Sequence, residues 1–200
     1  MRTNQRVGDR LQSLLLAALL ATGWSFAARG QEPSAAKGQP EKIAGYKEFL
    51  DRVQAYVTLH KSVASTLPAL KPTDLPEMIT AHQLALARKI REARPNAKHG
   101  DIFTEDARDA FRRAIREEFR GPDGHDARTT IRQGEPLSKV HLRVNEPYPD
   151  GVPFTTVPPT LLLKFPKLPD QVAYRIVGHD LILLDVKANL VVDRIPEIIP

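Results

Sequence analysis

The amino-acid sequence predicts an α+β fold in which three amphipathic helices are followed by a small antiparallel β-meander of three to four strands. Between residues 41 and 120, apolar side chains recur at three- and four-residue steps, as on one face of a helix. Between residues 168 and 196, β-branched residues form short runs divided by turn residues, as in a meander. The 200-residue chain has no cysteine, so its stability must come from an apolar core rather than from disulfides.

Residues 1–30 have the pattern of a secretory signal peptide. A basic segment ending at Arg10 precedes the apolar run 11–21, and small residues then fit cleavage after Ala27 or after Gly30. An uncleaved membrane anchor is the alternative, but about a dozen apolar residues are short for a helical bilayer span. We therefore expect an exported protein, periplasmic or secreted, with no stable membrane span after cleavage.

Removal of the signal peptide changes the charge of the chain. Its net charge falls from +5 to +2, because residues 1–30 hold four arginines and one aspartate. This near balance argues against a nucleic-acid partner. Residues 31–40 (QEPSAAKGQP) are polar and predict a disordered spacer. A single α+β domain is then expected over residues 41–200, with a helical part at 41–121, a connector at 122–139 and a sheet part at 140–200.

The first two helices are expected to form an antiparallel hairpin. An apolar stripe at helical spacing predicts the first helix over residues 41–67. Asp74 and Glu77 have the spacing of a capping box and predict the start of the second helix, which stops before Pro95. The short loop between them favours antiparallel neighbours. The second helix carries the apolar residues Met78, Ile79, Leu86 and Ile90.

The third helix has the clearest boundaries. Thr104 is a good N-cap residue, and Gly121 with Pro122 ends the helix after residue 120. Its outer face carries five arginines, Arg108, Arg112, Arg113, Arg116 and Arg120. Because acidic residues are interleaved with them, we expect a solvated face rather than a basic binding patch. A further short helix is expected near residues 127–132.

Four strands are expected after the connector. Residues 140–144 (VHLRV) alternate like a strand, the proline-dense residues 145–159 predict an extended connection, and residues 160–165 a helical turn. The meander strands are 172–177, 181–186 and 190–195, joined by turns at Gly178-His179-Asp180 and Lys187-Ala188-Asn189. The middle strand is apolar on both faces, so we expect it to be central and covered on both sides. The apolar residues after 195 are expected to dock on the domain.

Two motifs carry a resemblance to known sequences. Residues 119–124 read Phe-x-Gly-Pro-Asp-Gly after an arginine-rich helix, and residues 174–178 read Tyr-Arg-x-x-Gly at the first turn of the meander. With the signal peptide, this order resembles a group of uncharacterised exported bacterial proteins, over about residues 101–196. The resemblance implies an exported bacterial protein. It implies no activity and transfers no catalytic residue.

Few residues point to chemistry. The six histidines are His60, His82, His99, His125, His141 and His179. They form no helical zinc-enzyme pair, and the chain has no nucleophile elbow, phosphate-binding loop or Rossmann fingerprint. His60 continues an apolar stripe and is expected to be a packed or half-exposed histidine rather than a ligand. The strongest candidate cluster is His179 with Asp180, joined by Asp185 or His141, although polar residues belong in a turn and Asp185 can simply open the next one.

Two functions follow as expectations. The favoured one is an exported non-catalytic binding or accessory module that engages an envelope or secreted protein partner. The alternative is a small metal-binding or hydrolytic enzyme that uses the turn at His179 and Asp180. No catalytic, cofactor-binding or metal-binding residue is assigned, no cofactor is expected, and the oligomeric state is left open.

Overall fold

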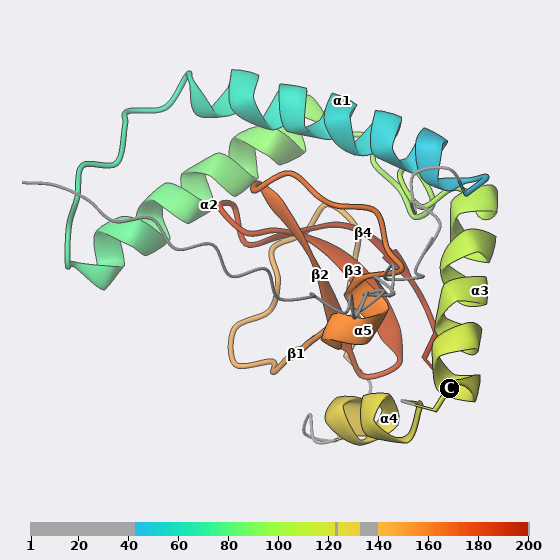
Figure 1. Cartoon of the computed structure of the whole chain (residues 1–200). Helices are drawn as coiled ribbons and strands as arrows, with labels where there is room; N and C mark the ends of the chain where they lie inside the picture. The colour runs from blue at the N-terminus through green and yellow to red at the C-terminus, as the bar shows by residue number, and fades with distance from the viewer. Residues whose placement is uncertain (1–42, 123, 133–139, 200) are drawn as a thin grey trace, which may run out of the picture. The chain divides into compact units, whose positions relative to one another are not determined.

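The computed structural model describes residues 43–122, 124–132 and 140–199 (Figure 1). The predicted signal peptide and spacer lie outside these residues. Within them the elements follow one another as α1 (Tyr46–Ala64), α2 (Pro76–Ala93), α3 (Glu105–Arg120), α4 (Gly124–Arg132), β1 (Thr155–Thr156), α5 (Pro159–Leu162), β2 (Val172–Val177), β3 (Asp180–Asp185) and β4 (Leu190–Ile195). The predicted α+β class is confirmed. None of the described helices is both long and apolar enough to span a bilayer.

The four strands form one antiparallel sheet in the order β1-β2-β3-β4. The predicted meander is confirmed, and its first turn places Gly178 at a φ of 58°, a left-handed conformation that glycine adopts without strain. The predicted strand at residues 140–144 is wrong, because that segment is irregular and the fourth strand is β1. The chain meets β4 only afterwards, through a bridge between Pro147 and Leu190. Since proline has no N–H, a regular ladder cannot continue there.

The middle strand β3 is buried on both faces, as its sequence predicted. Leu181 and Leu183 belong to the main core, which the helices share with the sheet. Ile182 and Leu184 belong to a second, smaller core on the opposite face, together with Leu142 of the irregular segment. The segment that failed to form a strand therefore still supplies the cover that the second face of β3 requires.

An aromatic cluster joins the helices to the sheet. Phe111 of α3 lies at its centre and is fully buried. Its ring centroid is 4.7–5.7 Å from those of Phe165, Tyr46, Phe49, Phe103 and Tyr174. These rings come from α1, α3, β2 and the loops between them. Their contacts therefore hold the helices against the sheet.

A buried carboxylate anchors the start of α3. Asp193 of β4 is fully buried beside an irregularity in the β3–β4 register. Its side-chain oxygens accept N–H groups from Gly100 at 3.1 Å and from Ile102 and Phe103 at 2.8 Å each. The loop before α3 is thereby held on the sheet by charge-assisted hydrogen bonds.

The helix ends differ from the prediction in detail. α1 is shorter than residues 41–67 and begins after Gly45, whose φ of 93° and close approach to the Asp106 carbonyl leave no room for a β-carbon. The predicted capping box is wrong, because α2 begins with Leu75 as N-cap and a proline in its first turn. The bounds of α3 agree with the prediction, but the Thr104 hydroxyl donates to Glu48 at 3.3 Å instead of capping the helix.

The remaining segments also find their places. α4 begins at Gly124, earlier than the predicted 127–132. A β-carbon at Gly124 would lie 2.4 Å from the Phe119 carbonyl. This close approach gives a physical reason for the last glycine of the Phe-x-Gly-Pro-Asp-Gly motif. The predicted docking of the final residues is confirmed. Ile198 and Ile199 are buried, and both donate their N–H groups to the His179 carbonyl, at 2.9 and 3.0 Å.

The position of β3 predicts the effect of a charge in the core. We expect Leu183→Asp to abolish cooperative thermal unfolding, because Leu183 is fully buried and the new carboxylate would have no partner. Circular dichroism during heating checks this. The matched control is Leu163→Asp, at a side chain that is 66% exposed, which should melt like the wild type. A normal melt of Leu183→Asp would contradict the assignment of β3 to the core.

Candidate functional site

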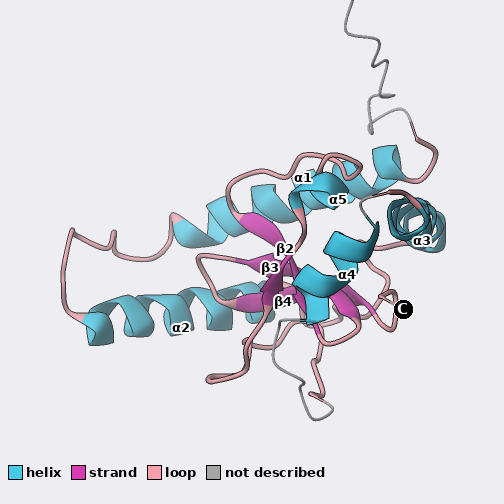
Figure 2. Ribbon diagram, turned by 60° about the horizontal axis from the view of Figure 1, so that its bottom comes forward, coloured by secondary structure: helices cyan, strands magenta, loops and turns pink. Residues whose placement is uncertain are grey.

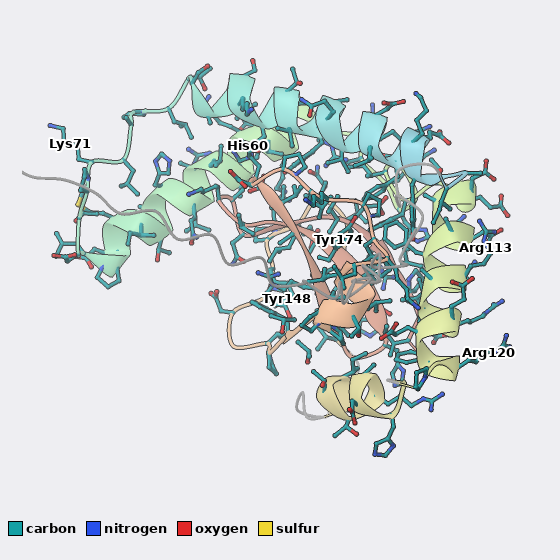
Figure 3. The ribbon with its side chains drawn as sticks, in the orientation of Figure 1. His60, Lys71, Arg113, Arg120, Tyr148 and Tyr174 are labelled. Atoms are coloured by element: carbon teal, nitrogen blue, oxygen red, sulfur yellow. The ribbon has the colours of Figure 1, made fainter. Side chains whose placement is uncertain are left out.

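The structure places His60 in a buried polar cluster that the sequence did not predict. His60 projects from α1 (Figure 3), and its Nδ1 lies 2.5 Å from Asp185 Oδ2. The Tyr56 hydroxyl donates to the same oxygen at 2.6 Å. The other carboxylate oxygen accepts the N–H groups of Lys187 and Ala188, which makes Asp185 the residue that opens the second turn. Because 125 residues separate His60 from Asp185, no local pattern could have indicated their pairing.

The Asp185 carboxylate orients the imidazole of His60, but the burial of the cluster indicates a structural role. An aspartate on one ring nitrogen fixes the tautomer of a histidine, as in catalytic dyads. Here, however, His60 is only 5% exposed, Tyr56 4% and Asp185 0%. Burial, followed by the charge of Asp185, raises the pKa of Tyr56 well above its ordinary value of 10.0, so the hydroxyl remains a donor. The cluster holds α1 against the β3–β4 turn and offers no access to a substrate.

The turn at His179 lies in a groove. His141, His179 and Asp180 line this hollow of about 670 Å³ together with Arg194 and Glu197. Three of the four residues suggested for a metal or hydrolytic site thus come together, whereas Asp185 lies at the opposite end of β3.

Two polar groups of this groove, the Asp180 carboxylate and the His179 Nδ1, are already engaged. Asp180 accepts the Arg194 guanidinium at 2.7 Å and the Glu197 N–H at 2.9 Å. His179 donates from Nδ1 to the Ile199 carbonyl at 2.8 Å. No group of three potential ligands is positioned to hold a metal ion within the described ranges. These contacts hold the final residues of the described chain on the sheet, so the groove lends no support to metal chemistry.

The far end of the α1–α2 hairpin exposes apolar side chains instead. Figures 1 and 2 both show the loop between the two helices extending away from the strands, and Figure 3 marks it by Lys71. We define the hairpin tip by its five exposed apolar residues, Leu70, Leu75, Met78, Ile79 and Leu84, which are 39–57% exposed. Met78 and Ile79, which the sequence placed among the apolar residues of the second helix, are 46% and 40% exposed. The first buried residue of α2 is Leu86.

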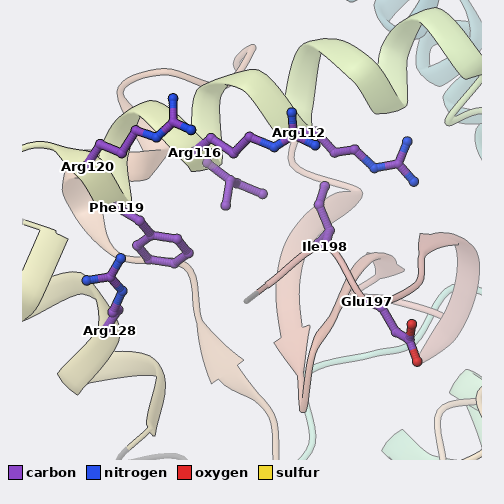
Figure 4. A pocket seen from close by; sticks show the side chains of 8 residues that line it. Arg112, Arg116, Phe119, Arg120, Arg128, Glu197 and Ile198 are labelled. Carbon is purple, nitrogen blue, oxygen red and sulfur yellow. The ribbon is translucent and has the colours of Figure 1, made fainter.

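A second surface feature lies along α3. Arg112, Arg116 and Arg120 line a pocket with Arg128 of α4 (Figure 4). The sequence predicted a solvated helix face here. The signal that it missed is Arg128, because only the approach of α4 to the end of α3 turns a row of arginines into a concave site.

Comparison with known proteins gives no family for this chain. No family model, no curated protein and no solved structure matches it. The resemblance to exported bacterial proteins therefore stays an expectation from its two motifs. Function has to be argued from the exposed surfaces themselves.

The buried cluster leads to a prediction on stability. We expect Asp185→Asn to lower the free energy of unfolding by about 3 kcal/mol. The side-chain nitrogen of asparagine cannot accept the hydrogen bond that the Tyr56 hydroxyl donates to Oδ2 of Asp185. Urea denaturation followed by circular dichroism measures the change. Asp150→Asn, at an exposed aspartate, is the control and should remain within about 0.5 kcal/mol of the wild type. Equal stability of both variants would contradict the anchoring role of Asp185.

The tyrosines predict the response to alkali. Burial raises the pKa of all four, to about 12 for Tyr148 and well above the ordinary value of 10.0 for Tyr56 and Tyr174, with Tyr46 raised in the same direction. An unfolded chain therefore loses these protons at lower pH than the folded one, so stability is retained below pH 10.0 and falls as the pH rises above it. Absorbance at 295 nm should show tyrosine ionisation coinciding with unfolding. Ionisation of all four near pH 10.0 with an intact fold would disprove this.

Proposed function

We propose that this protein is an exported, non-catalytic binding module whose hairpin tip docks into an apolar groove of an envelope or secreted protein. The observation that carries the proposal is the exposure of five large apolar side chains within fifteen residues of the chain, from Leu70 to Leu84. Exposed apolar patches rimmed by polar residues typically mark interaction sites. Export is supported by the signal pattern of residues 1–30 and by the motif resemblance.

The five apolar side chains of the hairpin tip are not among the buried residues of the core. The last buried residue of α1 is His60, and burial in α2 begins at Leu86. The partly buried Val63, Ala64 and Leu67 still pack against the main core, but none of the five tip residues does. The α1–α2 pair packs near the sheet through Leu86, Ala87 and Ile90. Between 39% and 57% of each tip side chain stays exposed to solvent. Their burial against a second molecule is the interaction that would use them, in the manner of a helix bound in a groove.

The charges around the tip favour a protein partner over an anionic lipid surface. Lys71 stands in the loop against Asp74 and Glu77, all three exposed, so the tip carries no excess of positive charge. Binding to anionic lipid relies on clustered lysines and arginines. A second copy of the same chain is the other occupant that the experiment must separate.

The enzyme alternative has less support, although His141, His179 and Asp180 line one groove. His60 and Asp185 are out of reach of a substrate, and Asp180 is paired with Arg194. The strongest histidine-carboxylate geometry in the described residues therefore serves the fold.

The decisive experiment is a pull-down from envelope and culture fluid with a tag placed within residues 31–40. We expect a stoichiometric partner, and we expect Met78→Glu/Ile79→Glu to reduce its capture at least about tenfold, since two buried apolar contacts are replaced by charges. The control is Leu162→Glu/Leu163→Glu, which changes two exposed apolar side chains at the end of α5 and its C-cap. Both double variants should melt like the wild type.

Three results would overturn the proposal. Capture could be lost equally in both double variants, or the protein could capture nothing while remaining monomeric. Analytical ultracentrifugation could instead show a dimer that the Met78/Ile79 variant dissociates, which would assign the tip to self-association rather than to a partner protein.

A further inference from the structure

We propose that the pocket between α3, α4 and the residues that follow β4 binds a small organic anion through carboxylate or phosphoryl oxygens. This arginine pocket has a volume of about 310 Å³ and is lined by Arg112, Ile115, Arg116, Phe119, Arg120, Arg128, Glu197 and Ile198. Its size is at the lower end of the range for small-molecule sites. It lies on elements other than the hairpin tip, so the inference is independent of the proposed function.

The cationic wall follows from helix geometry. Arg112, Arg116 and Arg120 recur every four residues, which places them in one row along α3, roughly 6 Å apart along the axis. Figure 4 shows this row on one side of the helix, with Phe119 and Arg128 next to it. Guanidinium groups remain charged at all physiological pH values and match the paired oxygens of carboxylates and phosphates.

Most of these arginines form no ion pair with another described residue. Asp109 contacts Arg112 at 3.3 Å. Within the described part of the chain, Arg116, Arg120 and Arg128 have no carboxylate within ion-pair distance. Like charges at four-residue spacing destabilise a helix, so an anion bound among them would remove a repulsion as well as form new hydrogen bonds.

The floor of the pocket is apolar. Ile115, Phe119 and Ile198 are 1%, 5% and 6% exposed. The Arg128 guanidinium stacks on the Phe119 ring, 5.4 Å from its centroid, which orients the group while its N–H donors stay available. A cationic wall above an apolar floor fits a ligand with an anionic end and an apolar body better than it fits a bare inorganic ion.

The pocket depends on two close backbone approaches. The lack of a β-carbon at Gly124 lets α4 begin against the Phe119 carbonyl, which brings Arg128 to α3. At the other rim, the backbone N–H of Glu197 donates to the Asp180 carboxylate, and the residue has a left-handed conformation with a φ of 46°. Glu197 is an acidic group in an otherwise basic lining, so it should weaken the binding of anions.

Calorimetric titration of the purified protein with phenyl phosphate, inorganic phosphate and phosphatidylglycerol vesicles tests the proposal. We expect phenyl phosphate to bind more tightly than inorganic phosphate, and Arg116→Ala/Arg120→Ala to weaken it at least about tenfold. Arg113→Ala removes one charge from α3 outside the pocket lining, against two in the double variant, and should change the affinity less than about twofold. Glu197→Gln should strengthen binding. Melting temperatures verify that each variant is folded.

The vesicle titration separates the two sources of such an anion. Binding of phenyl phosphate without vesicle binding indicates a free small acid, and binding of both indicates the headgroup of a lipid; each agrees with the proposal if the arginine variants respond as stated. Weakening by Arg113→Ala that is as large per charge removed as that of the double variant would show a diffuse charge effect and overturn it. So would the absence of phenyl phosphate binding to the wild type.

Discussion

Two buried carboxylates on the sheet fix the position of the helical layer. Asp185 receives the side chains of Tyr56 and His60, and Asp193 receives backbone N–H groups from the loop before α3. Both carboxylates are fully buried. A buried charge without such partners would cost several kcal/mol, so alternative placements of α1 or α3 over the same apolar surface are strongly disfavoured. Hydrophobic burial drives the layers together, and these carboxylates select one arrangement.

α1 and α3 are anchored near the sheet, and each has a surface that takes no part in the packing of the core. α1 is held at Tyr56 and His60, so the hairpin beyond them extends past the core. α3 is held at its start by Asp193 and along its inner stripe by Phe111, which leaves the arginine row on its outer side. Both surfaces considered for binding are therefore parts of well-anchored helices. A partner or ligand would meet them with little loss of backbone entropy.

Local signals in the sequence predicted much of this fold, and distant pairings account for most of what it missed. The bounds of α3 follow from Thr104 and Gly121, and the meander follows from β-branched runs between turn residues. Residues 140–144 do not form the predicted strand. Their alternating apolar side chains help to cover one face of β3, but their backbone does not pair in the sheet. Met78 and Ile79 follow the helical spacing of apolar residues in α2, but they remain exposed because burial in α2 begins only at Leu86. The pairing of His60 with Asp185 and the approach of Arg128 to α3 arise only after folding, so no local pattern could reveal them.

The edges of the sheet bear on how this molecule can associate. At the β4 edge, Leu190 and Val191 already face the segment around Glu146 and Pro147, with Val191 both donating and accepting a backbone hydrogen bond. At the other edge, β1 has only two residues and lies between prolines. Short or occupied edges are poor templates for an added strand. An exposed apolar tip on such a molecule therefore favours side-chain recognition over backbone pairing, and it does so without opening a route to cross-β fibres.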